Sequence, residues 1–166
     1  MLAGCGGTET VTQTETVTRT ETATRTETVG VGLPEAVETK RIAILEAARS
    51  GDADAVAALA ADQFNYTFGG PVEGGPAAYW RRLEASGEQP LEALAAILEL
   101  PYTLSGGIYV WPFAYDKTGE QLTDYERELL ETLPPDAAVF LPDGAYFGWR
   151  AGIEPDGTWI FFVSGD

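Results

Sequence analysis

Apolar residues recur every three or four positions in five stretches of the chain, which is the spacing of helices with one buried side. Their starts carry residues that favour helix initiation, namely proline at three of them, Asp52 as an N-cap, and the capping-box pair Thr123 and Glu126. The predicted helices run from residue 34 to 50, from 52 to about 61, from 76 through 83, from 90 to 99 and from 123 to about 133.

Apolar and polar residues alternate in other stretches, as in strands with one buried face. The predicted strands cover 63–68, 108–115, 139–141, 146–153 and 158–163, the last two joined by a turn at 154–157. Helices come first and strands late, so we expect an α+β fold. Its N-terminal helices would pack on a small, mainly antiparallel sheet that ends in a C-terminal β-hairpin.

Strand alternation also predicts which side chains share a face. In 108–115, four aromatic residues are expected on one face, and Pro112 suggests an edge strand or a bulge: Tyr109, Trp111, Phe113 and Tyr115. In 158–163, Trp159, Phe161 and Val163 are expected opposite Ile160 and Phe162, so both faces are apolar. That strand is therefore expected to be central or covered on both sides.

The aromatic residues are the richest candidates for ligand binding. Tyr109, Trp111 and Trp149 could form a platform for sugar rings or line a pocket. The alternative is that they fill the core, because aromatic side chains dominate the cores of small α+β domains. Arg150, between apolar faces, is expected either to be paired structurally or to meet an anionic ligand.

The first seven residues indicate where the protein resides. Leu2-Ala3-Gly4-Cys5 resembles the bacterial lipobox, in which the cysteine is lipidated after cleavage of a signal peptide. A complete signal also has a basic segment and an apolar segment upstream, so we expect residues 1–7 to be the end of a longer one. The resemblance implies that Cys5 is a lipid anchor, and that the protein is extracytoplasmic and held at the cell membrane.

Threonine occupies every second position from Thr8 to Thr28. The intervening residues are Glu, Gln, Arg, Val and Ala, so neither face is continuously apolar, and a packed strand is not expected. Low-complexity tracts of this kind usually serve as solvated stalks. We therefore interpret residues 8–33 as a disordered tether, and residues 34–166 as the globular domain.

A second resemblance covers about residues 44–85. The steps Gly51-Asp52 and Asp62-x-Phe64, followed by a helix from Pro76, resemble the opening of nuclear-transport-factor-two-like (SnoaL-like) domains. That family implies a cone-shaped pocket over a curved sheet, into which Arg150, Tyr66 or Trp80 would point. The chain departs from the family in having no histidine and in the helix expected at 90–99.

Net charge and the histidine and cysteine content exclude several classes of function. Ten basic and 26 acidic residues give a net charge of −16, of which −14 lies in residues 34–166, and this argues against nucleic-acid partners. The absence of histidine removes imidazole-based catalysis, and a single cysteine excludes an intramolecular disulfide. The stretch Asp116–Glu120 begins like a calcium loop, but Gln121 and Arg127 stand where Gly and Glu are required. We predict no catalytic residues, no metal site and no cofactor.

Together these observations predict a non-catalytic cell-envelope lipoprotein with a membrane-tethered binding or scaffolding domain. Two alternatives stay open: a pocketed small-molecule binder or degenerate enzyme of the nuclear-transport-factor-two type, and a module that binds cell-wall glycan. The expected partners are the membrane, through Cys5, and a glycan, a protein or a small molecule.

Overall fold

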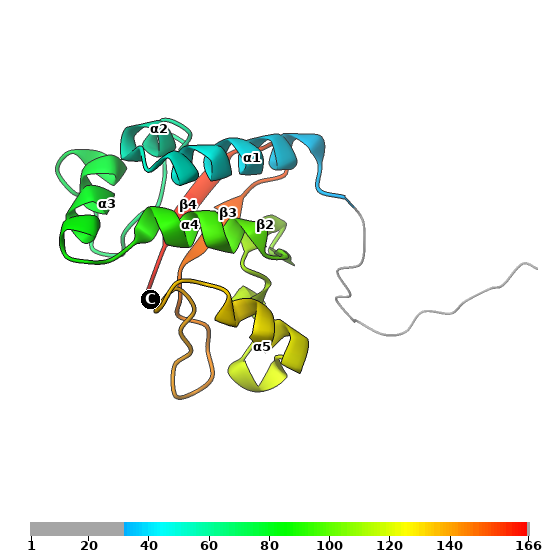
Figure 1. The fold of residues 1–166 in the computed structure, drawn as a ribbon. Coiled ribbons are helices and arrows are strands. Elements are labelled where there is room, and N and C mark those ends of the chain that lie inside the picture. Colours follow the sequence, from blue (N-terminus) through cyan, green and yellow to red (C-terminus); the bar gives the residue numbers. More distant parts are fainter. Residues whose placement is uncertain (1–31, 166) are drawn as a thin grey trace, which may run out of the picture.

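The structure is a computed structural model that describes residues 32–165 (Figure 1). The predicted lipobox, the Cys5 anchor and nearly all of the tether lie outside the described residues. In the part that is described, no helix is long and apolar enough to cross a membrane.

Five α-helices and a four-stranded antiparallel sheet confirm the predicted α+β class, including its C-terminal hairpin. In chain order the elements are α1 (Glu35–Ser50), α2 (Ala53–Ala57), α3 (Gly75–Ala85), α4 (Pro90–Glu99), β1 (Thr103–Ser105), β2 (Ile108–Trp111), the 3-10 helices η1 (Phe113–Asp116) and η2 (Gly119–Gln121), α5 (Asp124–Glu131), β3 (Arg150–Ile153) and β4 (Trp159–Val163). The strands follow the order β1-β2-β3-β4 in the sheet.

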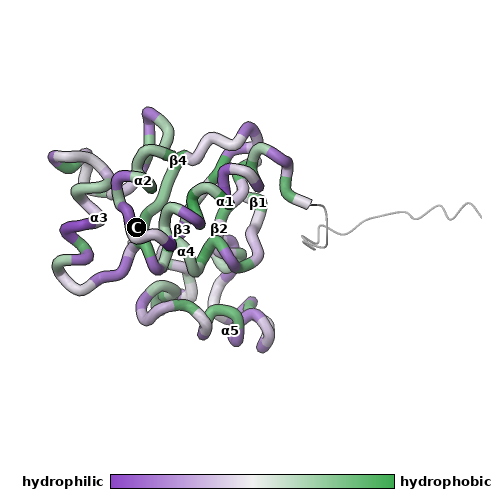
Figure 2. Tube along the Cα trace, turned by 45° about the horizontal axis from the view of Figure 1, so that its top comes forward, coloured by the Kyte–Doolittle hydropathy of each residue, from purple (hydrophilic) through white to green (hydrophobic). Residues whose placement is uncertain are grey.

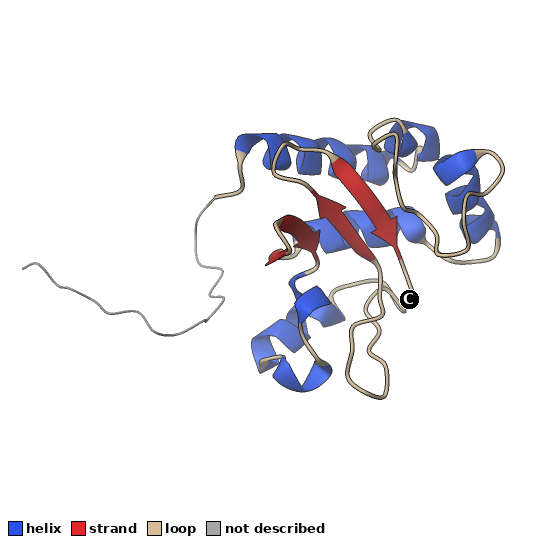
Figure 3. Cartoon of the chain, turned by 180° about the vertical axis from the view of Figure 1, so that it is seen from behind, coloured by secondary structure: helices blue, strands red, loops and turns tan. Residues whose placement is uncertain are grey.

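Helices α1 and α4 lie side by side across one face of the sheet, whereas no helix of residues 32–165 covers the opposite face (Figures 1 and 3). The guanidinium of Arg41 on α1 links the two helices. It donates hydrogen bonds to both carboxylate oxygens of Glu38, at 2.6 and 2.7 Å, and to the carbonyl of Leu98 on α4, at 2.8 Å. The cation therefore stabilises the C-terminal end of α4, where carbonyl groups lack partners within the helix.

Local signals set the start of α2, but tertiary contacts set its end. The carboxylate of Asp52 accepts hydrogen bonds from the backbone N–H groups of Asp54, at 3.0 Å, and Ala55, at 3.1 Å, as expected of an N-cap. The helix ends at Ala57 rather than near residue 61. The N–H of Ala61 instead donates to the carbonyl of Trp159 on β4, at 3.1 Å.

A bulge in β4 changes which of its side chains share a face of the sheet, compared with strict alternation. Ile153 pairs with Trp159 and Gly152 pairs with Phe161, which leaves Ile160 as an extra residue on β4. Trp159 and Phe162 therefore point to the same face, and both are fully buried. The predicted grouping of Trp159 with Phe161 and Val163 is wrong for this reason.

The strand predicted at 63–68 is reduced to one bridge beside β4. The N–H of Asn65 donates to the carbonyl of Ile160, at 3.0 Å, and the carbonyl of Asn65 accepts from the N–H of Phe162, at 2.9 Å. β4 is the last strand of the sheet rather than a central one, and this segment covers its outer edge.

The strand predicted at 108–115 ends at Trp111, because Pro112 has no N–H with which to continue the ladder. The chain then turns into η1, so the expected row of four aromatic residues extends no further than Tyr109 and Trp111. The prediction missed β1, which pairs with β2 across the two-residue turn Gly106-Gly107. The strand predicted at 139–141 consists of a single bridge between Phe140 and Tyr146.

The core lies between the helices and the sheet, and aromatic rings form its centre. Figure 2 shows hydrophobic stretches of α4, β3 and β4 gathered in this region. The ring centroids of Trp80 and Trp159 lie 6.3 Å apart, and Phe162 stacks on Trp149 at 4.6 Å. The first contact joins α3 to β4, and the second joins β4 to the residue that precedes β3.

Candidate functional site

The predicted aromatic platform is not formed, because its tryptophans belong to the core. Trp80, Trp111 and Trp159 are at most 1% exposed, and Trp149 is 7% exposed. The chain has four tryptophans, so none of them can present a ring face to a sugar from the surface. Packing decides between the two interpretations of these residues, and it favours the core.

Tyr66 and Tyr109 also have structural roles. The hydroxyl of Tyr66 accepts a hydrogen bond from the N–H of Val72, at 2.8 Å, which holds the loop after Asn65 against the domain. Tyr109 is half-buried, and its ring lies edge-on to that of Tyr102, with the centroids 5.4 Å apart. Neither residue lines the hollows described below.

Arg150 and the buried Ala151 are neighbours in β3, so their side chains point to opposite faces of the sheet. Arg150 lies on the face that no helix of the described residues covers. Its guanidinium donates to the carbonyl of Gly148, at 3.1 Å, and to that of Gly165, and it lies 5.4 Å from the ring centroid of Phe68. The structural pairing expected for this residue is therefore present. Phe68, the last residue of the strand predicted at 63–68, is a surface aromatic residue that is 57% exposed.

Tyr146 lies close to Arg150 and is the most strongly perturbed acid of the described chain. Its hydroxyl donates to the carbonyl of Trp149, at 2.8 Å, in a partly buried setting. Burial raises the pKa of Tyr146 well above its ordinary range, although the nearby charge of Arg150 opposes the rise. The neutral phenol thus serves packing and hydrogen bonding rather than proton transfer near neutral pH.

The structure therefore does not bring Tyr66, Trp80 and Arg150 together around one pocket. Trp80 is enclosed by Phe64, Trp159 and Phe162, and Arg150 lies across the sheet from it. A pocket of the nuclear-transport-factor-two type would need this space between helices and sheet to be open. Here aromatic rings fill it.

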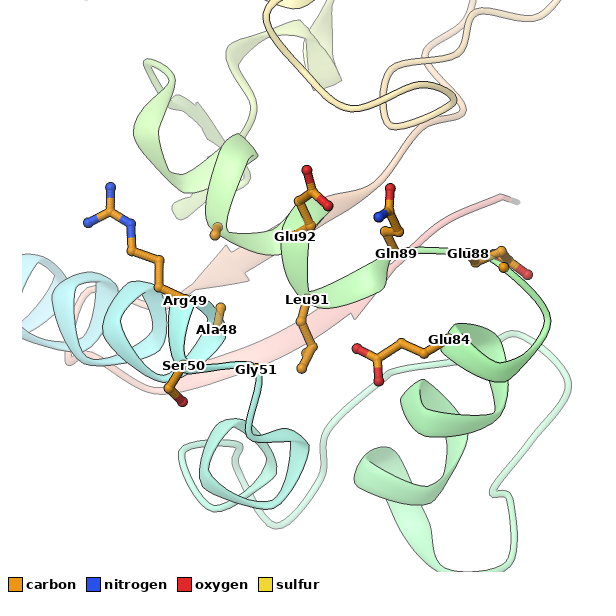
Figure 4. Close-up of a pocket in the computed structure, with 11 residues that line it drawn as sticks. Ala48, Arg49, Ser50, Gly51, Glu84, Glu88, Gln89, Leu91 and Glu92 are labelled. Atoms are coloured by element: carbon orange, nitrogen blue, oxygen red, sulfur yellow. The ribbon is translucent and has the colours of Figure 1, made fainter.

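A surface hollow is found instead where α1 ends, α3 ends and α4 begins (Figure 4). We call it the helix-end hollow, and its volume is about 670 Å³. Its lining residues come from two distant parts of the sequence: Ala48, Arg49, Ser50, Gly51, Glu84, Gly87, Glu88, Gln89, Leu91, Glu92 and Ala95. Glu84 and Leu91 point toward each other across it, and Arg49 points away (Figure 4).

Two glycines explain why this space stays open. Gly51 and Gly87 adopt φ angles of +71° and +98°, a region that residues with side chains rarely occupy. They turn the chain out of α1 and out of α3, and no atom lies within 4 Å of where a Cβ would be at either position. The chain therefore reverses direction at both positions without adding a side chain there.

The helix-end hollow combines an apolar floor with an acidic rim. Ala48 and Leu91 form buried parts of the floor, whereas Glu84, Glu88 and Glu92 carry the charge. The guanidinium of Arg49 pairs with Glu99, so it does not neutralise these three carboxylates. Among residues 32–165, no three Asp, Glu, Cys or His side chains are arranged to hold a metal ion. The glutamates were visible in the sequence, but only the fold shows that they meet residues 48–51.

Most cations of the described domain are engaged within the molecule. Ion pairs join Arg41 to Glu38, Arg49 to Glu99, Arg81 to Asp54, and Lys117 to Glu126. Lys40, Arg127 and Arg150 donate to backbone carbonyls. The surplus carboxylates consequently dominate the charge of the described domain's surface.

No family model, no curated protein and no solved structure matches this chain.

Proposed function

We propose that this chain is a cell-envelope lipoprotein, anchored through Cys5, whose domain at 34–166 binds or scaffolds a partner outside the cytoplasm. The observation that carries the proposal is the order of three segments: a lipobox-like tetrapeptide, a tract with threonine at alternate positions, and a folded domain whose first helix begins at Glu35. A lipid on Cys5 would supply the membrane affinity. The domain itself then has no need of a membrane-binding surface.

The tract between anchor and domain supports the same arrangement. Residues 6–33 could span on the order of 90–100 Å if fully extended. β-Branched threonines favour extended backbone conformations over helix. The tether would therefore hold the domain well clear of the lipid headgroups and within reach of other envelope components.

Binding is better supported than catalysis by the residues available. The chain has no histidine, and none of its four serines lies in a nucleophile-elbow sequence. The helix-end hollow has three carboxylates around an apolar floor, which suits recognition of a ligand more than activation of a nucleophile. The residues singled out for the two alternatives give them less support, since the tryptophans are buried and Trp80 and Arg150 lie apart.

The decisive test changes one atom of the anchor. Bacteria expressing the native gene would be grown with an alkyne-tagged fatty acid, and the chain would be examined for label and for sedimentation with membranes. We expect the native chain to be labelled and membrane-bound, and Cys5→Ser to lose both properties. Thr8→Ser is the matched control, because it is an equally small change outside the lipobox. Equal labelling of the native chain and Cys5→Ser would contradict the proposal.

The side of the membrane is tested separately with trypsin on cells whose outer layer has been made permeable. Arg19 and Arg25 are the basic residues of the tether and provide its cleavage sites. We expect cleavage there to release the folded domain into the medium while a cytoplasmic marker protein stays intact. Protection of the chain until the cells are lysed would place the domain inside.

A further inference from the structure

Helix α5 stands apart from the layer formed by α1, α4 and the sheet (Figures 1 and 3). Only Leu130 of its eight residues is buried. The helix is held mainly by its flanks: the N–H of Gly119 in η2 donates to the carbonyl of Gly144, at 2.9 Å, and Leu122 and Leu133 are buried on either side of it. One side of α5 therefore lies beside a space that the domain does not fill.

That space is a second hollow of about 520 Å³, which we call the α5 hollow. It is lined by Gly119, Glu120, Leu122, Arg127, Leu130, Glu131 and Phe140. Leu122, Leu130 and the half-buried ring of Phe140 make its floor apolar. Phe140 is fixed from behind by Tyr146, whose ring centroid lies 5.4 Å away in an edge-on arrangement. Such a floor gains most from covering by an apolar side chain.

The rim of the α5 hollow determines which partner can supply that side chain. Glu120 in η2 and Glu131 in α5 are exposed on the rim. Asp124 and Glu128 are also exposed on α5. Lys117 pairs with Glu126, whereas Arg127, which also lines the hollow, donates to the carbonyl of Leu122, at 3.0 Å, and keeps its positive charge. The lining thus carries two carboxylates, Glu120 and Glu131, and one guanidinium, which leaves an excess of negative charge around the apolar floor.

A second copy of this chain is a poor occupant, because residues 34–166 carry a net charge of −14 and two copies would repel each other. A partner with lysine or arginine around an apolar side chain meets both the floor and the rim. Electrostatic complementarity of this kind directs which partner docks and how fast it associates.

We propose that the α5 hollow is a docking site for a basic segment of a partner protein, which inserts one apolar side chain between Leu122, Leu130 and Phe140. Lysine or arginine residues on either side of it pair with Glu120 and Glu131. This inference rests on the proposed function only in treating the domain as a binding module, and it does not depend on the anchor.

The test measures binding of a fluorescein-labelled peptide, two lysines on each side of one phenylalanine, to the full 166-residue chain in solution. Fluorescence anisotropy gives the affinity, and amide chemical shifts locate the site. We expect the shifts to concentrate at residues 119–122, 127–131 and 140. Replacing the peptide's phenylalanine by alanine should weaken binding by about tenfold. The double variant Glu120→Gln/Glu131→Gln should weaken it by about fivefold.

The matched control is Glu84→Gln/Glu88→Gln, which removes the same charge from the helix-end hollow. Binding to this variant should stay within about twofold of the native value, since its carboxylates lie outside the docking site. Equal losses in both variants would mean attraction by overall charge alone and would overturn the proposal. Shifts at 119–131 that grow with protein concentration without peptide would overturn it in favour of self-association. Either result leaves the anchoring test unaffected, because that test reads the lipid on Cys5.

Discussion

The ring of Phe161 lies over the backbone of Gly152, in the space that a side chain at position 152 would need. The two residues are cross-strand partners in β3 and β4, and a Cβ at Gly152 would approach Cε1 of Phe161 to 2.2 Å. The contact covers the backbone on the helix-free face of the sheet. It also explains why a glycine stands inside a strand, where glycine is otherwise unfavourable.

We therefore expect Gly152→Ala to lower the free energy of unfolding by about 2 kcal/mol, because the methyl group displaces the ring of Phe161. Urea denaturation measures the change. In a Phe161→Ala background the same substitution should cost less than about 0.5 kcal/mol, since the obstacle is gone. Gly69→Ala is the control, because its Cβ would meet no atom closer than 3.8 Å. The same cost with and without the ring of Phe161 would contradict the explanation.

The pair Glu38 and Arg41 predicts an effect at acid pH. Hydrogen bonding to Arg41 lowers the pKa of Glu38 below 4.5, with burial opposing the shift and the charge of Arg41 assisting it. A lowered native pKa stabilises the fold above the unfolded value, and that contribution is lost as pH falls through the native pKa. The Glu38 side chain is 38% exposed, so solvent screening limits its contribution to about 0.5 kcal/mol at pH 7.

Denaturation of the native chain and Glu38→Gln should consequently differ at neutral pH and converge below pH 4.5. Glu46→Gln, at an exposed position on the same helix, is the control and should change stability little at either pH. A difference that persists unchanged to pH 2 would show that Glu38 acts through packing.

Tyr146 predicts a loss of stability at alkaline pH. Its pKa is raised, chiefly by burial, so the native phenol keeps its proton after an unfolded tyrosine has lost it. The free energy of unfolding should then fall above about pH 10, by about 1.4 kcal/mol per pH unit for this one group. Tyr146→Phe should cost about 1 kcal/mol at neutral pH through the lost hydrogen bond, and should remove this part of the alkaline slope. Parallel curves for the two proteins between pH 10 and 12 would disprove the assignment.

Tryptophan fluorescence tests the packing of the core. Because all four tryptophans are at most 7% exposed, acrylamide should quench the folded protein several-fold less than the protein in urea. Strong quenching of the folded chain would mean that at least one ring is accessible, and it would restore the glycan-binding alternative.

The capping box of α5 predicts how much the N-cap stabilises this helix. The hydroxyl of Thr123 accepts from the N–H of Glu126, at 3.2 Å, and the Glu126 carboxylate accepts from the N–H of Thr123, at 2.9 Å. Thr123→Ala should destabilise this helix by about 1 kcal/mol, whereas Thr123→Ser should restore the cap. Hydrogen exchange of the α5 amides measures the effect. Faster exchange throughout the domain, rather than in α5 alone, would show that the helix is not a separate unit.

The sequence predicted the helix starts well because the caps that set them are local. Asp52 caps α2, and Thr123 with Glu126 caps α5, through bonds between residues two or three apart. Strand facing was less predictable, because the extra residue Ile160 depends on which residues of β3 lie opposite. The aromatic row expected to continue beyond Trp111 is not formed, because Pro112 ends the strand. The sequence had indicated this, since Pro112 suggested an edge strand or a bulge.

The candidate sites were hardest to predict. The sequence suggested that Trp111 and Trp149, from two different predicted strands, could form a platform, but only packing shows whether such side chains are covered. The helix-end hollow is made by residues 48–51 and 84–95, and the α5 hollow joins residue 140 to residues 119–131. Neither concavity corresponds to a pattern within one stretch of the chain.

The backbone bonds from Ala61 and Asn65 to β4 have a consequence for how molecules can associate. A ribbon of molecules joined strand to strand needs two accessible edges on every member. Here the outer edge of β4 is occupied within the molecule, so among residues 32–165 only the three-residue β1 presents an edge, at the other end of the sheet. Joining two molecules through β1 would use up the last edge of both. Edge-to-edge growth of this sheet would therefore stop at a pair, however closely the molecules are crowded.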